Sequence, residues 1–144
     1  MFGDRLNTGI RGGQFYIYDD IPLYWDAWDV MDYHLETQRE LPFTAATEFQ
    51  SIAEGPIVGI SKFTGTFGNN STLEKYTIIR ADSPLIEYYV VIDWKEDHKM
   101  LKVEFPVDVL TREATFEIQY GHLKRPTHMN TTWEMAKFEV CGHK

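Results

Sequence analysis

Carboxylates and tryptophans are interleaved in one short stretch of the sequence. Between Asp19 and Asp29 the chain reads DDIPLYWDAWD, which places Trp25 and Trp28 beside Asp26 and Asp29. Indole rings stack on the apolar faces of pyranose sugars, and carboxylates accept hydrogen bonds from sugar hydroxyls. These residue types in this order are typical of a sugar-binding site. Trp25, Asp26, Trp28 and Asp29 are therefore candidate substrate-contacting residues.

This stretch has two interpretations, one catalytic and one structural. A glycosidase needs two carboxyl groups that flank the scissile bond, about 5–5.5 Å apart when configuration is retained. Asp26 and Asp29 would meet that spacing on one helical turn, because residues three apart share a side of a helix. The structural alternative is a capped turn whose tryptophans pack in the core and whose acids face solvent. The sequence by itself favours the structural alternative.

A second cluster of polar residues lies between residues 122 and 130, which read HLKRPTHMN. Arg125, His128 and Asn130 could bind a carboxylate, a phosphate or a sugar hydroxyl, because all three carry hydrogen-bond donors. A zinc site needs three or four converging ligands, and the histidine spacing here matches no standard zinc pattern. We therefore predict that this chain contains no metal site and holds no cofactor.

No motif for nucleophilic catalysis is present in the sequence. Cys141 is the one cysteine, and no general base can be placed beside it, so we expect a small buried thiol. The sequence also lacks the nucleophile elbow GxSxG, the phosphate-binding P-loop and the zinc motif HExxH. We assign no catalytic residue.

The size and charge of the chain limit its architecture and its partners. Its 144 residues and 16.8 kDa suit a single domain over residues 1–144. A net charge of −8 argues against nucleic acid and against anionic membrane as partners, because both require a basic surface. No apolar run approaches the roughly 20 residues that span a bilayer.

Apolar residues recur mainly with a period of two, which predicts an all-β fold, an antiparallel sandwich. The clearest alternating segments lie at 100–109, 116–120 and 136–140, and weaker strands fall at 14–18, 45–53, 57–67 and 73–81. Segment 85–94 is apolar on both faces, so we predict a central strand there. Pro106 predicts that segment 100–109 is an edge strand or contains a bulge.

Two segments depart from the strand pattern. Tyr24, Trp28 and Met31 follow helical spacing, which predicts one short helix or compact loop near 23–33. Segment 121–134 contains Gly121 and several hydroxyl residues without periodicity, so we expect an irregular loop there.

Three longer stretches resemble a known family of enzymes. They are Tyr18–His34 (YDDIPLYWDAWDVMDYH), Leu101–Val107 (LKVEFPV) and Gln119–Val140 (QYGHLKRPTHMNTTWEMAKFEV). Together they resemble the β-rich region of the family 38 glycoside hydrolases, the α-mannosidases, and most of all the cytosolic neutral type. The likeness follows the whole chain in order and is weaker over 36–85.

The resemblance implies a role inside a larger enzyme. Such enzymes hydrolyse α-mannosyl linkages in oligosaccharides with retention, using an aspartate nucleophile, an acid/base carboxylate and a divalent metal, zinc or cobalt. Those residues belong to upstream domains of the family, and none can be matched to a position in this chain. The implied partners are the catalytic domain of the same polypeptide and a mannose-containing oligosaccharide. The implied location is cytoplasmic.

Two further expectations follow for the chain by itself. An excised β-domain exposes surfaces that its neighbours would cover, so we expect self-association. We also expect one of the two indoles of Trp25 and Trp28 to be largely buried and the other to lie nearer the surface. The alternative function is a stand-alone carbohydrate-binding module that uses Trp25 and Trp28 as a platform.

Overall fold

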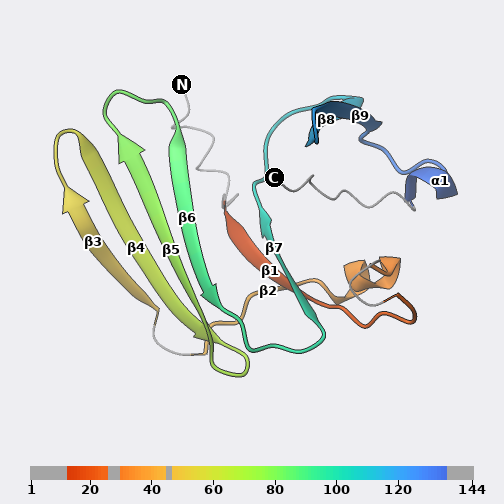
Figure 1. The fold of residues 1–144 in the computed structure, drawn as a ribbon, viewed down its shortest axis with the longest axis horizontal. Coiled ribbons are helices and arrows are strands. Elements are labelled where there is room, and N and C mark those ends of the chain that lie inside the picture. The colour runs from red at the N-terminus through yellow and green to blue at the C-terminus, as the bar shows by residue number, and fades with distance from the viewer. Residues whose placement is uncertain (1–12, 26–29, 45–46, 136–144) are drawn as a thin grey trace.

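The computed structural model describes residues 13–25, 30–44 and 47–135, which form antiparallel β-sheets (Figure 1). The strands are β1 (Gln14–Asp19), β2 (Arg39–Glu40), β3 (Glu48–Glu54), β4 (Val58–Phe67), β5 (Ser71–Arg80), β6 (Ile86–Asp93), β7 (Lys99–Glu104), β8 (Glu113–Ile118) and β9 (Gly121–Pro126). The helical elements are the 3-10 helix η2 (Asp32–Thr37) and the single turn α1 (Thr132–Met135). The predicted all-β class is confirmed.

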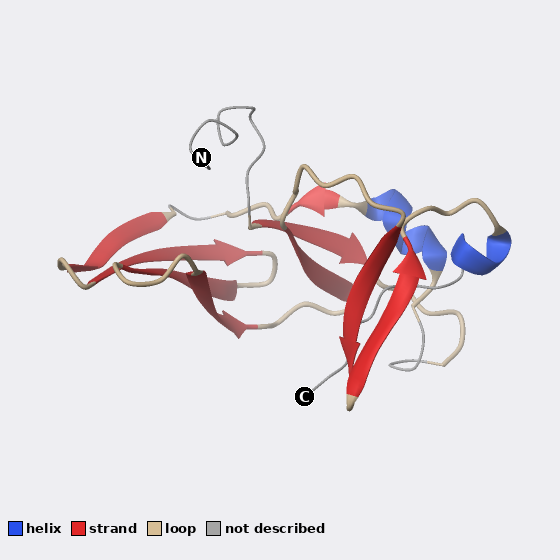
Figure 2. Ribbon diagram, turned by 90° about the horizontal axis from the view of Figure 1, so that it is seen from above, coloured by secondary structure: helices blue, strands red, loops and turns tan. Residues whose placement is uncertain are grey.

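The described strands divide into three sheets. One has the order β2-β1-β7, a second has the order β3-β4-β5-β6, and β8 pairs with β9 in a hairpin. In Figure 2 this hairpin runs steeply across the direction of the other strands. Among the described residues, no helix is long and apolar enough to cross a membrane.

The hydrophobic core lies where the first two sheets meet. Phe15 and Ile17 of β1 and Leu41, which follows β2, pack with Phe67 of β4 and Leu73 of β5. Both Phe67 and Leu73 have no exposed surface. The alternation along β1 and β5 turns these residues toward one interior, which is the packing predicted for an antiparallel sandwich.

A tight turn between β4 and β5 is held by a distant carboxylate. Glu96 accepts hydrogen bonds from the Asn69 backbone N–H at 2.6 Å and from the Ser71 hydroxyl at 2.7 Å. Gly68 has a φ of 49°, in the left-handed region, and a Cβ at this position would collide with the Glu96 carboxylate. Glycine is favoured here because φ is positive, and a side chain would also displace the Glu96 carboxylate.

The prediction of a central strand at 85–94 is wrong. Strand β6 occupies this segment, but it pairs only with β5 among the described residues and lies at an edge of its sheet. This edge strand carries apolar residues at the surface on both faces, so two apolar faces do not indicate a buried strand here. The prediction for 100–109 is confirmed, because β7 is an edge strand that ends at Glu104, before Pro106.

The irregular loop predicted at 121–134 is wrong in its first half. Strand β9 forms there because its backbone pairs with β8 over its whole length, from Gly121 opposite Ile118 to Pro126 opposite Glu113. Neither face of β9 is consistently apolar, so the sequence shows no period-two alternation there even though the backbone is paired.

The helical segment near 23–33 is confirmed in part of its range. Residues 23–25 form an exposed bend, and η2 begins at Asp32 and continues to Thr37. Residues 26–29 lie outside the described residues, as do the strand predicted at 136–140 and Cys141.

Candidate functional site

The loop that follows β1 presents large apolar side chains to solvent. Leu23 is 68% exposed, Tyr24 is 72% exposed and Trp25 is 73% exposed. Trp25 also has a φ of 61°, a left-handed backbone conformation that is uncommon for a bulky residue. Exposed aromatic rings on a strained turn suit contact with a ligand or another domain. Asp26, Trp28 and Asp29 lie outside the described residues, so their grouping with Trp25 stays a prediction.

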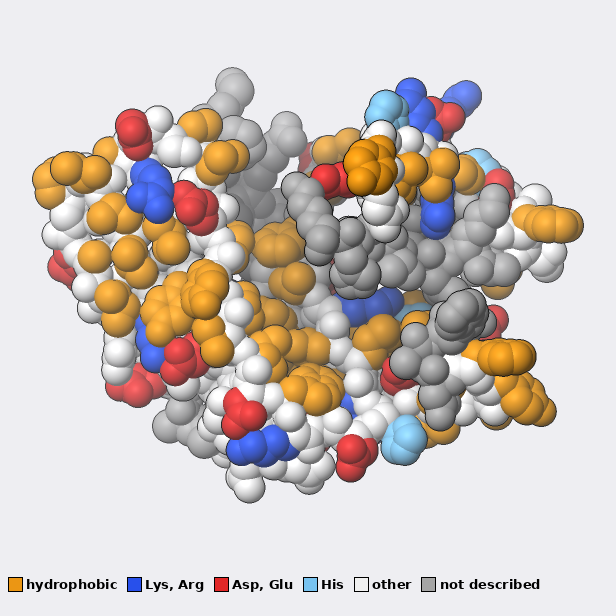
Figure 3. Space-filling model, viewed as in Figure 1, with side chains coloured by type: hydrophobic (Ala, Val, Ile, Leu, Met, Phe, Trp, Pro, Cys, Tyr) orange, Lys and Arg blue, Asp and Glu red, His pale blue; other side chains and the backbone are white. Residues whose placement is uncertain are grey.

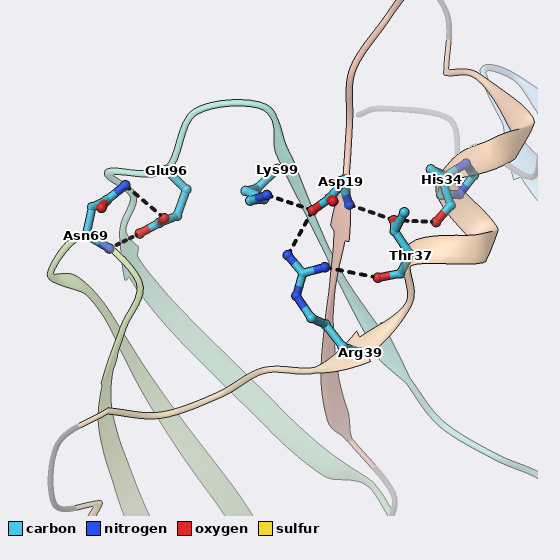
Figure 4. A network of polar contacts seen from close by, with 7 residues as sticks. All are labelled: Asp19, His34, Thr37, Arg39, Asn69, Glu96 and Lys99. Atoms are coloured by element: carbon cyan, nitrogen blue, oxygen red, sulfur yellow. Dashed lines mark hydrogen bonds and ion pairs between the residues drawn. The ribbon is translucent and has the colours of Figure 1, made fainter.

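The base of this loop is attached to its sheet by a shared carboxylate (Figure 4). Asp19 Oδ1 lies 2.6 Å from Lys99 Nζ on β7 and 2.8 Å from Arg39 Nη2 on β2. The Asp19 backbone N–H also donates to the Thr37 hydroxyl at 2.8 Å. The hydrogen bond from Lys99, followed by that from Arg39, holds the pKa of the Asp19 carboxyl below its ordinary value. Asp19 therefore positions the loop and is already paired with two cations.

A buried histidine anchors the far end of the same loop. His34 on η2 is 1% exposed, and its Nδ1 lies 2.7 Å from the Met31 carbonyl oxygen. Because a carbonyl can only accept, Nδ1 carries the proton, and Nε2 accepts from Lys102 Nζ at 3.1 Å. Burial lowers the pKa of the Lys102 amine, which also lies over the Tyr18 ring. No sequence pattern indicates this pair, because the two residues are 68 positions apart.

The second predicted cluster lies around the end of β9 and the start of α1. Arg125 is half-buried on β9 opposite Ala114. His128 Nδ1 lies 3.2 Å from a Glu134 carboxylate oxygen, which forms an ion pair when the imidazole is protonated. Asn130 is exposed and immediately precedes the residue that caps α1.

Glu134 belongs to a capping box that the sequence analysis missed. The Thr131 backbone N–H donates to Glu134 Oε2 at 3.0 Å, and the Glu134 backbone N–H donates to the Thr131 hydroxyl at 3.3 Å. Desolvation acts to raise the pKa of Glu134, but hydrogen bonds from Thr131 and the charge of His128 outweigh it and lower that pKa. The T-x-x-E spacing at 131–134 was the available signal.

The described side chains of the two clusters therefore lie on separate elements. Trp25 belongs to the β1–η2 loop, whereas His128 and Asn130 flank a capping box after the β8–β9 hairpin. Among the described residues, no group of three or more His, Cys, Asp or Glu side chains could hold a metal ion. The part of the chain that the structure describes does not fit the divalent metal expected for the parent enzyme.

Comparison with known proteins decides the family. The model of the glycosyl hydrolases family 38 C-terminal domain matches residues 4–144. The chain belongs to glycosyl hydrolases family 38. The predicted family is thereby confirmed, and the match places this family 38 chain in the C-terminal domain of such proteins.

Individual relatives are named alpha-mannosidases. Human alpha-mannosidase 2C1 is 46% identical over 141 residues, which cover 98% of this chain and 14% of the relative. Alpha-mannosidase G of Dictyostelium discoideum is 35% identical, covering 94% of this chain and 13% of the relative. An alpha-mannosidase of Saccharomyces cerevisiae is 36% identical over 94% of this chain and 13% of its own length. The family 38 chain thus spans about one seventh of the length of its curated relatives.

Proposed function

We propose that this chain is the β-domain of an α-mannosidase that hydrolyses α-mannosyl linkages in oligosaccharides. The observation that carries the proposal is the 46% identity to human alpha-mannosidase 2C1 along 98% of the chain. In the parent enzyme the partners of this domain are its catalytic domain and a mannose-containing oligosaccharide. The resemblance to the cytosolic type supports a cytoplasmic location.

Within that enzyme, this segment acts as a scaffold or contacts substrate and does not catalyse hydrolysis. The carboxylates beside the two candidate clusters support this role, because Asp19 is held by two cations and Glu134 caps a helix. A nucleophile and an acid must instead be free to reach the anomeric carbon and the leaving oxygen. The retaining chemistry and the zinc or cobalt ion belong to other parts of the parent enzyme.

Hydrolysis of a chromogenic α-mannoside tests the non-catalytic role. The 144-residue chain is expected to give no turnover with zinc or cobalt present. Turnover that disappears in Asp26→Asn would contradict the proposal and make the aromatic loop an active site. A trace rate that is unaffected by Asp26→Asn would indicate a contaminating enzyme, and repurification of the protein should remove it.

The stand-alone carbohydrate-binding module is a second candidate, favoured by one observation. Trp25 is 73% exposed on a turn beside the equally exposed Tyr24, as a sugar platform requires. In a module, mannose-containing oligosaccharide should quench tryptophan fluorescence at millimolar concentration or below, and Trp25→Ala should abolish the change. Trp133→Ala is the matched control, because Trp133 is 79% exposed on α1. Absence of binding by the wild-type chain favours the scaffold role.

A further inference from the structure

Two lysines on the four-stranded sheet lie on opposite sides of it. Lys62 of β4 is paired across the strands with Tyr76 of β5, and Lys75 is the residue before Tyr76, so the two lysine side chains point to opposite sides. Lys62 Nζ lies 2.7 Å from Glu74 Oε1 and 5.4 Å from the centre of the Tyr76 ring. Figure 3 shows charged side chains of both signs close together over this sheet, among hydrophobic ones. Lys62 is thus neutralised within its own sheet.

Lys75 has aromatic neighbours in place of a carboxylate. Its Nζ lies 5.8 Å from the centre of the Phe15 ring and 5.9 Å from the centre of the Tyr88 ring, and Tyr88 packs against Phe105. The Lys75 amine forms no ion pair with any of the described residues, and burial lowers its pKa. Aromatic rings attract a cation but carry no net charge. Lys75 is therefore a partly desolvated cation that lacks a counter-charge in the part of the chain that the structure describes.

The side of the sheet that carries Lys75 is apolar and only partly covered. Leu73 lies two residues before Lys75 and is buried in the core, so this is the core-facing side. The junction with the first sheet covers the end that holds Leu73 and Phe67. Large apolar side chains on the rest of this side are exposed: Phe49, Ile79, Ile86, Tyr88 and Val90. We call these five residues, with Lys75 among them, the Lys75 face.

We propose that the Lys75 face is covered in the parent α-mannosidase by a segment outside residues 1–144, which brings apolar side chains and one carboxylate that pairs with Lys75. This inference rests on the proposed function. An apolar surface with a single uncompensated cation is complementary to an apolar surface that carries one acid. The chain corresponds to 14% of the length of human alpha-mannosidase 2C1, so most of such a parent lies outside it.

A second copy of this chain fits the Lys75 face less well. A two-fold interface contains the same residues from both partners, so it would add another Lys75 and not a new acid. The carboxylate that β3 to β6 place on this side is Glu54, at the end of β3 and two strands away from Lys75. The charge of the face therefore favours the rest of the parent polypeptide as its occupant.

Carbodiimide cross-linking of the polypeptide encoded by the whole reading frame tests the proposal. A water-soluble carbodiimide joins an amine to a carboxylate in direct contact and leaves no spacer between them. Peptide mass spectrometry should find Lys75 joined to an Asp or Glu outside residues 1–144. Lys62 is the matched control on the same sheet and should be joined to Glu74 in the same sample.

Acylation of lysine amines at neutral pH is a second measurement. In the 144-residue chain Lys75 should react faster than Lys62, because burial lowers the pKa of Lys75 while Glu74 raises that of Lys62. In the parent the order should reverse and the rate ratio should fall at least about tenfold, since pairing that raises a pKa by one unit lowers the neutral fraction about tenfold.

Three results would overturn the inference. They are a Lys75 link to a carboxylate within residues 1–144, in the same copy or in a second one, a Lys62–Glu74 link without any Lys75 link, and faster acylation of Lys75 than of Lys62 in the parent. Hydrolysis of a chromogenic α-mannoside by the same preparation tests the proposed function separately. An active parent without the Lys75 link would retain the proposed function and reject this inference, and an inactive parent with the link would do the reverse.

Discussion

The junction between the two larger sheets and the β8–β9–α1 region are stabilised in different ways. At the junction, Phe67 and Leu73 are fully enclosed, and strands from both sheets contribute to one core. From Glu113 to Met135, none of the described residues is buried, and the contacts are strand pairing, a capping box and ion pairs. Cooperative stability therefore resides in the junction, whereas the C-terminal region holds its polar side chains by local contacts.

Truncation of core residues should give the largest difference between the two regions. Phe67→Ala is expected to cost about 3–5 kcal/mol of unfolding free energy, the range for large buried aromatics. Leu123→Ala in β9 should cost less than about 1 kcal/mol, because Leu123 is 40% exposed. Urea denaturation of both variants measures the difference. Equal costs would mean that the hairpin is part of the same core.

Substitution of two glycines compares the cost of adding a Cβ atom at the β4–β5 turn and in β9. Gly68→Ala should cost more than about 1 kcal/mol, because φ is positive and the new Cβ collides with Glu96. Gly121→Ala in β9 is the control, since a Cβ there meets no atom within 4 Å. The double variant Gly68→Ala/Glu96→Ala should be less destabilised than the sum of its single changes. Strict additivity in urea denaturation would show that the collision does not contribute.

Acid should weaken the three-stranded sheet through Asp19. Its pKa is lowered in the folded chain by Lys99 and Arg39, so its contribution is present above the ordinary carboxyl value near 4 and is lost as pH falls below it. Melting temperature measured from pH 6 to pH 2.5 should therefore fall less steeply in Asp19→Asn than in the wild type. Parallel curves would show that the two cations do not stabilise the carboxylate.

The smallest effect is expected at the capping box. Glu134→Gln removes the negative charge but keeps an oxygen that can accept from the Thr131 N–H, so global unfolding should not change measurably. The lowered pKa of Glu134 predicts that its local contribution is lost as pH falls below the ordinary glutamate value. Amide exchange at 131–135 should then increase in acid in the wild type. The variant should lack this pH dependence, and if it keeps it, another group is responsible.

Local sequence patterns predicted the strands that have one buried face. The segments 14–18, 57–67 and 73–81 correspond to β1, β4 and β5, because alternation of side chains follows from strand geometry alone. The family resemblance likewise needed only the order of residues in the chain. Pro106 limited β7 because proline cannot donate a backbone hydrogen bond to a neighbouring strand.

Tertiary structure decided what depends on partners distant in the chain. Segment 85–94 has the composition of a central strand, but only the arrangement of the sheets places β6 at an edge. Strand β9 forms through backbone pairing, which leaves no mark on side-chain polarity. Asp19 acquires its role from Arg39 and Lys99, 20 and 80 residues away. Composition and alternation are properties of neighbouring residues, whereas edges, ion pairs and sites depend on which distant segments the fold brings together.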